Sequence, residues 1–280
     1  MKGIVTRTVG GFFFPADKEQ NIYRTGIRGR INKRIYPGDY VEFKNGIIEK
    51  LYPRNNLLIR PQVANIDQIL IILSTDNPPY HLRNLDRFLI VSEKAGLNPL
   101  IIINKIDLVE NLEILQKDFQ VYEKAGYRVY YISVKGRNGL EKLCKELQGH
   151  INVLTGPSGA GKSSLLNSII RGAKLQVGEI SKKLKRGVHT TKHVQLLPLD
   201  NEGWVADTPG FNSLDISHIS PNELSFFYPE FWDYHNKCKF RACSHTHEPG
   251  CAVKKAFKKG IISERRYNNY CNFYNELQGE

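Results

Sequence analysis

Runs of alternating apolar and polar residues dominate the first part of the chain. Turn residues separate these runs, which fall at 3–6, 11–14, 21–24, 39–43 and 46–49. Short alternating runs between turns are typical of strands in a small β-barrel. The pair Asn45–Gly46 between the last two runs is a strong signal for a hairpin. We therefore predict an all-β domain over residues 1–63.

Continuous apolar runs take over after a polar segment at 53–61, which we interpret as a linker. Runs with the length of strands lie at 67–73, 100–103, 128–132, 150–155, 194–197 and 203–206. Apolar residues at helical spacing predict helices at 82–95, 108–125 and 139–147. Buried strands that alternate with helices are typical of a parallel sheet covered on both faces. Residues 64–218 are therefore predicted to form an α/β domain, in which the basic stretch 175–192 indicates a mobile loop.

The last segment, 219–280, has a helical pattern, so the predicted class is multidomain α/β with a β-barrel first and a helical domain last. No apolar run approaches the roughly 20 residues of a membrane-spanning helix, and the N-terminus lacks the apolar stretch of a signal peptide. We therefore expect a cytoplasmic protein without a membrane partner. The net charge of +12 indicates an acidic polymer as partner, nucleic acid before membrane, although a basic surface that binds nothing is the alternative.

A glycine-rich loop of the pattern G-x-x-x-x-G-K-S follows the strand predicted at 150–155 and precedes a helical pattern. Its residues are Gly156, Pro157, Ser158, Gly159, Ala160, Gly161, Lys162 and Ser163, followed by Ser164. Glycines let backbone N–H groups turn toward an anion, and the next helix adds the positive end of its dipole. The pattern predicts a nucleotide phosphate site in which Lys162 reaches the β- and γ-phosphates and Ser163 binds Mg²⁺.

A second predicted strand ends in the N-K-x-D pattern of guanine-binding proteins, formed by Asn104, Lys105, Ile106 and Asp107. A carboxylate at this position accepts hydrogen bonds from guanine N1–H and the N2 amino group, and adenine offers neither donor. Ser133, which also follows a predicted strand, is similar to the serine element whose backbone N–H meets guanine O6. The sequence therefore predicts GTP and GDP as ligands.

The strand predicted at 203–206 is followed by D-T-P-G, from Asp207 to Gly210. An aspartate here holds the Mg²⁺ shell, and the Gly210 N–H bonds the γ-phosphate. Thr190 or Thr191 supplies a second hydroxyl to Mg²⁺, and we favour Thr190. In ordinary small GTPases the phosphate loop comes first, whereas here N-K-x-D precedes it and D-x-x-G follows it. The predicted α/β domain is therefore a circularly permuted P-loop GTPase, in which a γ-phosphate-dependent change can pass to the C-terminal segment.

Three of the five cysteines lie close together in the C-terminal segment, with a histidine between them: Cys238, Cys243, His245 and Cys251. Three thiolates and one imidazole at this spacing fit a closed, structural Zn²⁺ site. His247 is a rival to His245 as the fourth ligand, and scattered reduced cysteines are the alternative to a metal site.

The permuted motif order, the N-terminal barrel and the Cys/His cluster together resemble one family, the ribosome small-subunit-dependent GTPases known as RsgA, YjeQ or YloQ. The resemblance covers essentially the whole chain and is carried by 104–107, 156–164, 186–191, 207–210, the Cys/His cluster and 252–254. It implies an OB-fold barrel, a permuted GTPase domain and a zinc-binding domain. It also implies binding to the small ribosomal subunit and its rRNA during late 30S maturation, with GTP turnover stimulated by that subunit.

The sequence departs from common GTPase patterns in places. Phe211 follows Gly210, where many GTPases have a glutamine that orients water, so intrinsic hydrolysis is expected to be slow. Members of the family carry a histidine where His218 stands, which makes His218 a candidate catalytic residue, with a surface or packing histidine as the alternative. Gly159 stands where potassium-activated relatives have asparagine, so K⁺ dependence is not predicted.

Basic residues of the barrel and of the C-terminal segment are expected to bind RNA phosphates. In the barrel they are Arg24, Arg28, Arg30, Lys33 and Arg34, beside a possible stacking face made by Phe12, Phe13 and Phe14. The alternative is that at least two of these phenylalanines belong to the core. In the C-terminal segment the basic residues are Lys254, Lys255, Lys258, Lys259, Arg265 and Arg266, which form solvated helix faces in the alternative interpretation.

We expect a monomeric enzyme, a GTPase that converts GTP and water into GDP and phosphate. Two other hypotheses stay open. A nucleotide-switched RNA-binding factor needs no hydrolysis, and Phe211 favours it. An ATP-dependent enzyme would use the same phosphate loop, but the N-K-x-D pattern argues against it.

Overall fold

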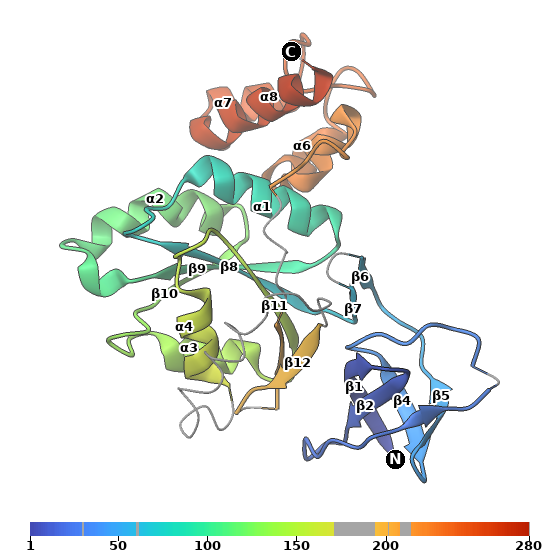
Figure 1. Ribbon diagram of the computed structural model, residues 1–280. Coiled ribbons are helices and arrows are strands. Elements are labelled where there is room, and N and C mark those ends of the chain that lie inside the picture. The colour runs from blue at the N-terminus through green and yellow to red at the C-terminus, as the bar shows by residue number, and fades with distance from the viewer. Residues whose placement is uncertain (30, 60–61, 171–193, 201, 208–213, 280) are drawn as a thin grey trace.

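The computed structural model describes residues 1–29, 31–59, 62–170, 194–200, 202–207 and 214–279. A small β-barrel, an α/β part and a helical part follow one another from the N-terminus to the C-terminus (Figure 1). The predicted α/β class is therefore confirmed.

A circuit of paired strands forms the barrel. Its strands are β1 (Lys2–Val9), β2 (Phe12–Ala16), β3 (Gly26–Ile27), β4 (Tyr40–Lys44) and β5 (Ile47–Leu51). β1 pairs with β2 and β4, β4 pairs with β5, and β5 pairs with β3. Two backbone hydrogen bonds between Phe13 and Thr25 join β2 to the chain just before β3 and close the circuit. The interior contains Val5, Ile35, Val41, Phe43 and Ile48.

The strand predicted at 21–24 is wrong. This segment contributes only one isolated bridge to the barrel. Asp17 is the cause, because its carboxylate accepts a hydrogen bond from the N–H of Asn21 and another from the hydroxyl of Tyr23, each at 2.9 Å. Local bonds from an aspartate compete with strand pairing, so the segment stays irregular apart from the bridge at Ile22, and the strand begins after it.

The linker predicted at 53–61 is wrong in part, because it contains a strand. β6 (Leu57–Ile59) pairs with β7 (Gln62–Ala64) in a separate two-stranded sheet. The Asn56 side chain accepts from the N–H of Ile66 at 2.9 Å and donates to the Ile66 carbonyl at 2.7 Å. A side-chain amide that pairs with the opposite backbone in this way fixes a hairpin in a segment without apolar periodicity.

Parallel strands form the centre of the molecule. They are β8 (Gln68–Ser74), β9 (Asn98–Asn104), β10 (Arg128–Tyr131), β11 (Ile151–Thr155) and β13 (Trp204–Asp207), with β12 (Gln195–Pro198) antiparallel to β13. The order across the sheet is β10-β9-β8-β11-β13-β12. The helices are α1 (Leu82–Lys94), α2 (Leu112–Lys124), α3 (Leu140–Leu147) and α4 (Lys162–Ile169), with a short 3₁₀ helix η1 (Ile106–Leu108). Each of these strands and α-helices overlaps a predicted element.

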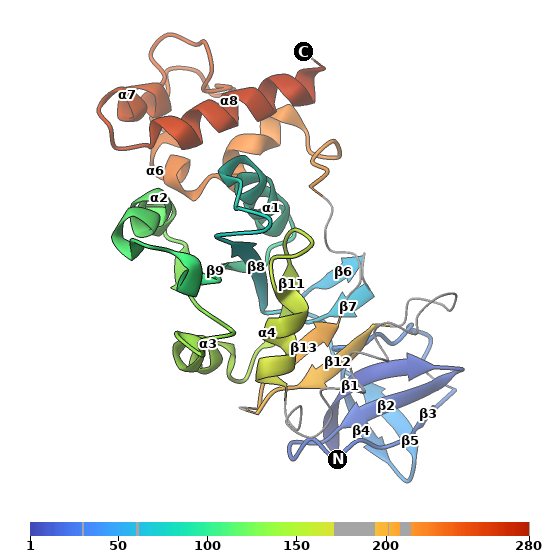
Figure 2. The same cartoon turned by 60° about the vertical axis from the view of Figure 1, so that its left-hand side comes forward.

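Alternate residues of the central strands face different pairs of helices. Leu70 and Ile72 of β8 pack in the cluster that contains residues of α3 and α4. Ile71 and Leu73 pack instead with residues of α1 and α2. The two helix pairs therefore cover opposite faces of the sheet (Figure 2). This burial on both faces explains why the strand is a continuous apolar run in the sequence.

The barrel and the central sheet are joined edge to edge. β1 pairs antiparallel with β12 at Arg7 and Gln195, so the hydrogen-bonded strand order runs on from β12 through β1 to β4. Ile4 of the barrel packs in one apolar cluster with Val63 and Trp204. The barrel is therefore anchored beside β12, and β12 and β13 separate it from β11, the strand that leads into the phosphate loop.

Short helices make up the C-terminal part. They are η3 (Pro221–Phe227), η4 (Pro229–Phe231), α6 (Trp232–His235), α7 (Ala252–Lys258) and α8 (Glu264–Gln278). This part packs on Ile90 of α1 and is anchored by Arg266, which forms ion pairs with Asp86 and Glu230. The prediction that Arg266 binds RNA is wrong, because the side chain is 1% exposed. Among the described helices, none combines the length and apolarity needed to cross a membrane.

Candidate functional site

The phosphate loop lies where the strand order of the sheet reverses. The chain runs outward from β8 to β9 and β10 and then returns to β11 on the other side of β8. Open α/β sheets bind ligands at the carboxyl ends of their strands at such a point. The N-K-x-D pattern ends β9, the serine element follows β10, and D-T-P-G starts at the end of β13. Parallel pairing of these strands brings the predicted motifs to one edge, although their order in the sequence is permuted.

Two glycines fix the path of the phosphate loop. Gly156 has φ of 132°, and a Cβ there would lie 2.1 Å from the carbonyl oxygen of Ile72. Gly161 has φ of 96°, and a Cβ there would lie 2.2 Å from Nδ2 of Asn104. Any other residue would therefore collide with the neighbouring strands as well as strain the backbone. Ser158, Gly159, Ser163 and Ser164 are exposed on the loop and the first turn of α4, whereas Ala160 is buried.

Lys162 begins α4 and folds back over the loop. Its Nζ donates to the carbonyl oxygens of Gly156 and Pro157, both at 2.7 Å. Burial lowers the pKa of Lys162, because the charged ammonium loses solvent. The ammonium is thus held by the loop in which the glycine-rich pattern predicts a phosphate chain.

Asn104 ties the motifs together. Its side chain is 3% exposed, and Nδ2 donates to the Ala160 carbonyl of the phosphate loop at 3.0 Å. Its Oδ1 accepts from the N–H of Val134 in the serine element at 3.3 Å. Asn104 was predicted to select guanine, which stays a prediction, and both ends of its amide are bonded to protein. The structure therefore makes it the brace that sets the distance between the phosphate loop and the guanine motifs.

Asp107 is exposed in η1 and is left as the carboxylate that can meet a base. A hydrogen bond from the side chain of Ser133 is the main cause that holds the pKa of Asp107 below its usual range. The buried Ser133 hydroxyl also accepts from the N–H of Gly136 at 2.8 Å. Asp107 follows β9 and Ser133 follows β10. The hydrogen bond between their side chains brings these two predicted residues together.

A segment that the sequence prediction missed lies over the phosphate loop. Lys105 has φ of 65°, and its Nζ donates to the carbonyl oxygens of Asp76 at 2.6 Å and Asn77 at 2.9 Å. A Cβ on Gly159 would lie 2.9 Å from Cδ of Pro78. The sequence contains a signal for this segment, because Asp, Asn and Pro follow the buried strand β8 at the same sheet edge as the other motifs. Lys105 therefore joins the loop after β8 to the N-K-x-D motif.

Several predicted residues are placed only in part. Asp207 ends β13 and pairs with Gln195 across the sheet. Gly210, Phe211 and Thr190 lie outside the described residues, as does the whole of the loop predicted at 175–192. His218 is exposed in a turn between Leu214 and Glu223. The Leu214 carbonyl accepts from Arg87 in the middle of α1, and Glu223 pairs with Lys94, the last residue of α1. His218 therefore lies beside α1, and its catalytic role stays a prediction.

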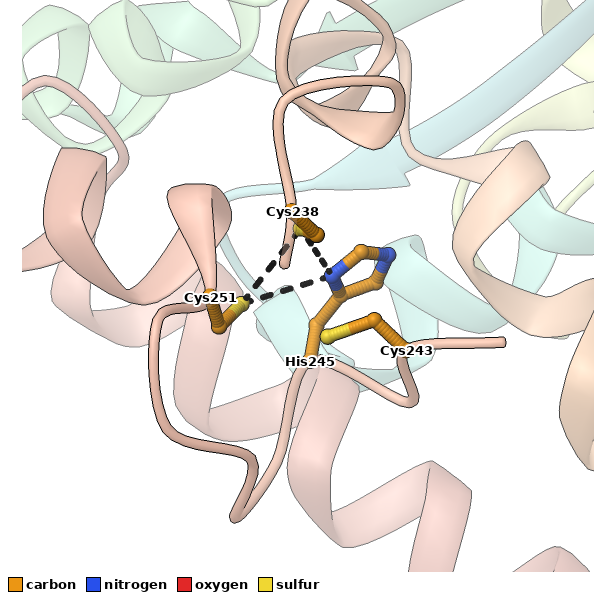
Figure 3. Close-up of side chains that lie close together, drawn as sticks. All are labelled: Cys238, Cys243, His245 and Cys251. Atoms are coloured by element: carbon orange, nitrogen blue, oxygen red, sulfur yellow. Dashed lines mark hydrogen bonds between the residues drawn. The ribbon is translucent and has the colours of Figure 1, made fainter. Parts of the chain in front are cut away.

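The predicted Cys/His cluster is assembled in the C-terminal part. The ligand atoms of Cys238, Cys243, His245 and Cys251 all lie within 4.8 Å of one another. Figure 3 shows the three sulfur atoms grouped around the His245 ring. The Sγ atoms of Cys238 and Cys251 are 3.9 Å apart, and they lie 3.6 Å and 3.5 Å from His245 Nδ1.

These distances fit a zinc ion. A tetrahedral Zn²⁺ with ordinary bond lengths places two sulfur ligands about 3.8 Å apart and a sulfur and a nitrogen about 3.6 Å apart. Burial lowers the pKa of His245 to about 4, so its imidazole is neutral and ready to bind a metal. The N–H groups of Ala252 and Lys254 point at Cys238 Sγ and Cys251 Sγ, which suits thiolates. His247 is exposed and bonds to Thr246 instead, so the geometry favours His245 over its rival.

The basic and aromatic residues of the barrel are divided between surface and core. Phe12 is 41% exposed and lies under the guanidinium of Arg24, 3.8 Å from ring centre to Cζ. Phe13 packs against the barrel interior, and Phe14 is half-buried beneath Arg7. Of the three phenylalanines, Phe12 therefore offers the largest free face for stacking.

Comparisons with known proteins match this arrangement over the whole chain. The sequence profile of the RsgA GTPase family matches residues 51–217. A small ribosomal subunit biogenesis GTPase RsgA from Alkaliphilus metalliredigens is 41% identical, over 99% of this chain and 98% of that protein. Its namesake from Halalkalibacterium halodurans is 42% identical, over 99% of this chain and 97% of the relative.

Solved structures agree with the sequence relatives. YjeQ from Thermotoga maritima superimposes with a TM-score of 0.85 and 35% identity, covering 100% of this chain and 99% of that one. YloQ, described as a circularly permuted GTPase, superimposes with a TM-score of 0.84 and 32% identity, covering 99% and 95%. The phosphate loop, the permuted order of its partner motifs and these full-length similarities lead to one conclusion: the chain belongs to the RsgA GTPase family.

Proposed function

We propose that this chain hydrolyses GTP to GDP and phosphate during maturation of the small ribosomal subunit. The observation that carries the proposal is the Asn104 amide, which bonds the phosphate loop at Ala160 and the serine element at Val134. One side chain thus sets the spacing between a phosphate site and a guanine site. A nucleotide with guanine at one end and phosphates at the other spans that distance.

Each motif then has a chemical role. Lys162 and the loop N–H groups bind the β- and γ-phosphates, and Asp107 and the Ser133 region recognise guanine. Lys105 fixes the Asp76–Asn77 segment above the phosphate loop. Mg²⁺ neutralises developing phosphate charge, and the residues proposed to hold it are Ser163, Thr190 and Asp207, with the Gly210 N–H directed to the γ-phosphate.

The partner follows from the relatives and from the charge. The curated relatives are named for biogenesis of the small ribosomal subunit, and a chain with a net charge of +12 is suited to rRNA. We assign RNA binding to an OB-fold barrel at 1–63, GTP turnover to 64–218, and a structural Zn²⁺ to the helical domain at 219–280. The protein is proposed to act in the cytoplasm as a monomer.

GTP turnover by the purified chain, alone and with small ribosomal subunits at matched salt, tests the proposal. A large stimulation by the subunits is expected, because Phe211 cannot orient water and another group must complete the site. Lys162→Ala should abolish turnover in both conditions. Lys142→Ala is the matched control, because Lys142 is exposed on α3. Turnover that is unchanged by subunits, with GTP still bound, would contradict the proposed partner.

A further inference from the structure

A cleft opens in the C-terminal part beside the Cys/His cluster. It measures about 320 Å³ and is bordered by η3, α6 and the loop that leads to His245. Cys243 and His245 contribute to its wall, but Cys238 and Cys251 do not, so the cleft is distinct from the space between the metal ligands. Among the described residues that line it, none is acidic. A cleft with such a lining is suited to a ligand that carries negative charge.

One wall of the cleft is aromatic. Phe226 is 58% exposed, and its ring lies edge-to-face with the aromatic ring of His235, with the ring centroids 5.1 Å apart. His235 is itself stacked on His245, with ring centroids 5.2 Å apart and planes at 11°. Trp232 Nε1 donates to the Phe226 carbonyl at 2.8 Å and fixes the backbone from which the Phe226 ring projects. The cleft thus has a rigid aromatic side with an exposed ring.

The rim of the cleft is polar and basic. Asn222 and Asn236 are exposed at its edge, and within the described part of the chain neither side-chain amide has a hydrogen-bond partner. Arg241 is exposed on the same rim. It ends the loop 237–241, which carries three cations and no acid. The loop is held at Cys238, within it, and at Cys243, just beyond it, so a metal on the cluster would fix the position of the basic rim.

We propose that this cleft binds one unstacked nucleotide of a single-stranded RNA segment. The base stacks on Phe226, the free amides of Asn222 and Asn236 bond its edge, and Arg241 pairs with the phosphate. Single-stranded RNA is recognised by proteins through such aromatic stacking and through hydrogen bonds to base edges. A duplex cannot enter a cleft of this size, because its bases are already stacked and paired. The inference rests on the proposed function, which supplies RNA as the partner.

Binding of a fluorescein-labelled 12-nucleotide RNA of adenosine, cytidine and uridine tests the inference by fluorescence anisotropy. Guanosine is left out so that the nucleotide site of the GTPase part does not bind the probe. Phe226→Ala in the full-length, zinc-loaded chain should weaken binding about fivefold or more, since it removes the stacking of one base. Ile114→Ala is the matched control, because Ile114 is a similarly exposed apolar residue on α2, and it should leave affinity unchanged.

The salt dependence of binding distinguishes the contribution of the phosphate contact from that of base stacking. Arg241→Ala should make the slope of log affinity against log salt shallower by about 0.7, the value for one phosphate of a single strand. Phe226→Ala should leave that slope unchanged, and so should the control Lys142→Ala on α3. If Phe226→Ala and Arg241→Ala both bind the probe like the wild type while retaining zinc, the inference is overturned. A wild-type chain that does not bind the probe overturns it as well.

GTP turnover with small ribosomal subunits distinguishes this inference from the proposed function. If subunits stimulate the wild type while Phe226→Ala and Arg241→Ala both bind the probe like the wild type, the cleft inference fails and the proposed function stands. If subunits do not stimulate the wild type and the two variants still weaken probe binding as expected, the cleft binds RNA and the proposed partner is wrong.

Discussion

Arg266 on α8 donates from Nη1 to Asp86 Oδ1 on α1 at 2.8 Å, and the two side chains are 1% and 0% exposed. Asp86 also accepts from the hydroxyl of Tyr122 on α2 at 2.8 Å, and Arg266 pairs with Glu230 of η4 at 2.7 Å. This buried network links the C-terminal part to two helices of the GTPase part. It is a buried polar connection between the part that carries the Cys/His cluster and helices α1 and α2 of the central sheet.

Arg266→Met should destabilise the protein by about 3–5 kcal/mol, because it leaves buried carboxylates without their cation. Urea unfolding measures the change in the free energy of unfolding. Arg83→Met is the control, since Arg83 pairs with Glu276 at 3.6 Å on the surface and is 54% exposed. Surface pairs of this kind contribute below about 1 kcal/mol. Equal losses in the two variants would contradict the role given to the buried network.

Gly161→Ala should weaken GTP binding strongly. The new Cβ would meet Asn104 Nδ2 at 2.2 Å and displace the amide that braces the phosphate loop. Gly149→Ala is the control, because Gly149 also has a positive φ, 70°, but has open space around its Cβ position. Both variants introduce a similar backbone strain. A lower affinity of Gly161→Ala for a fluorescent GDP analogue, measured by titration, would therefore report the clash with Asn104. Equal affinities would show that the brace is not needed for binding.

Asp107→Asn should reduce GTP affinity by about 10²-fold or more, because an amide replaces one of the two acceptors that guanine requires. ATP affinity should stay as low as in the wild type. Glu110→Gln, a change at a nearby exposed carboxylate, should have no effect. Competition of GTP and of ATP against a fluorescent guanine nucleotide gives the ratio of GTP affinity to ATP affinity. An unchanged ratio in Asp107→Asn would mean that another residue selects the base.

The pH dependence of GTP binding follows from the same carboxylate. The Ser133 hydrogen bond holds the pKa of Asp107 below its ordinary 3.8, so the binding form is the ionised one. A lowered pKa means that its contribution is complete above 3.8 and is lost only as the pH falls through the lowered value. The part of the affinity that depends on Asp107 should therefore be equal at about pH 5.5 and about pH 7.5. Ser133→Ala should move the acid limb of the affinity profile to higher pH, and an acid limb that does not move would contradict this account.

His245→Ala should lose zinc, whereas His247→Ala should retain it. Of these two histidines, His245 is the one that brings a ring nitrogen to 3.6 Å from Cys238 Sγ and 3.5 Å from Cys251 Sγ. Zinc content per chain by elemental analysis measures the difference. Because zinc must displace protons from the cysteine thiols, zinc affinity of the wild type should rise with pH. Burial is the main cause that raises the pKa of Cys243 to about 12. Zinc loss in His247→Ala with retention in His245→Ala would reverse the ligand assignment.

The local motifs could be predicted from the sequence because their chemistry is contained in a few neighbouring residues. Gly156 and Gly161 are needed for backbone angles within one loop. The spacing from Cys238 to Cys251 already limits which metal the segment can hold. The periods of apolar residues likewise located the central strands and helices, since burial on two faces leaves a continuous run.

Contacts between distant segments could not be predicted in the same way. The residues next to Arg266 and Lys258 in the sequence do not indicate that Arg266 is buried and that Lys258, on the preceding helix, is exposed. The difference depends on Asp86, which lies 180 residues away in the chain. The turn at Asp17 also overrode an apolar pattern, because side-chain bonds to its neighbours competed with strand pairing.

The sequence by itself thus determined the chemistry of this protein: a phosphate loop, a guanine motif and a Cys/His cluster, in a permuted order. Only the tertiary structure decided that Asn104 braces the phosphate loop 56 residues later, that Lys105 holds the segment after β8, and which cations face solvent. The physical reason is that the motifs depend on backbone geometry and ligand spacing within short segments. Bracing and burial depend on which distant side chains the parallel sheet and its helices bring into contact.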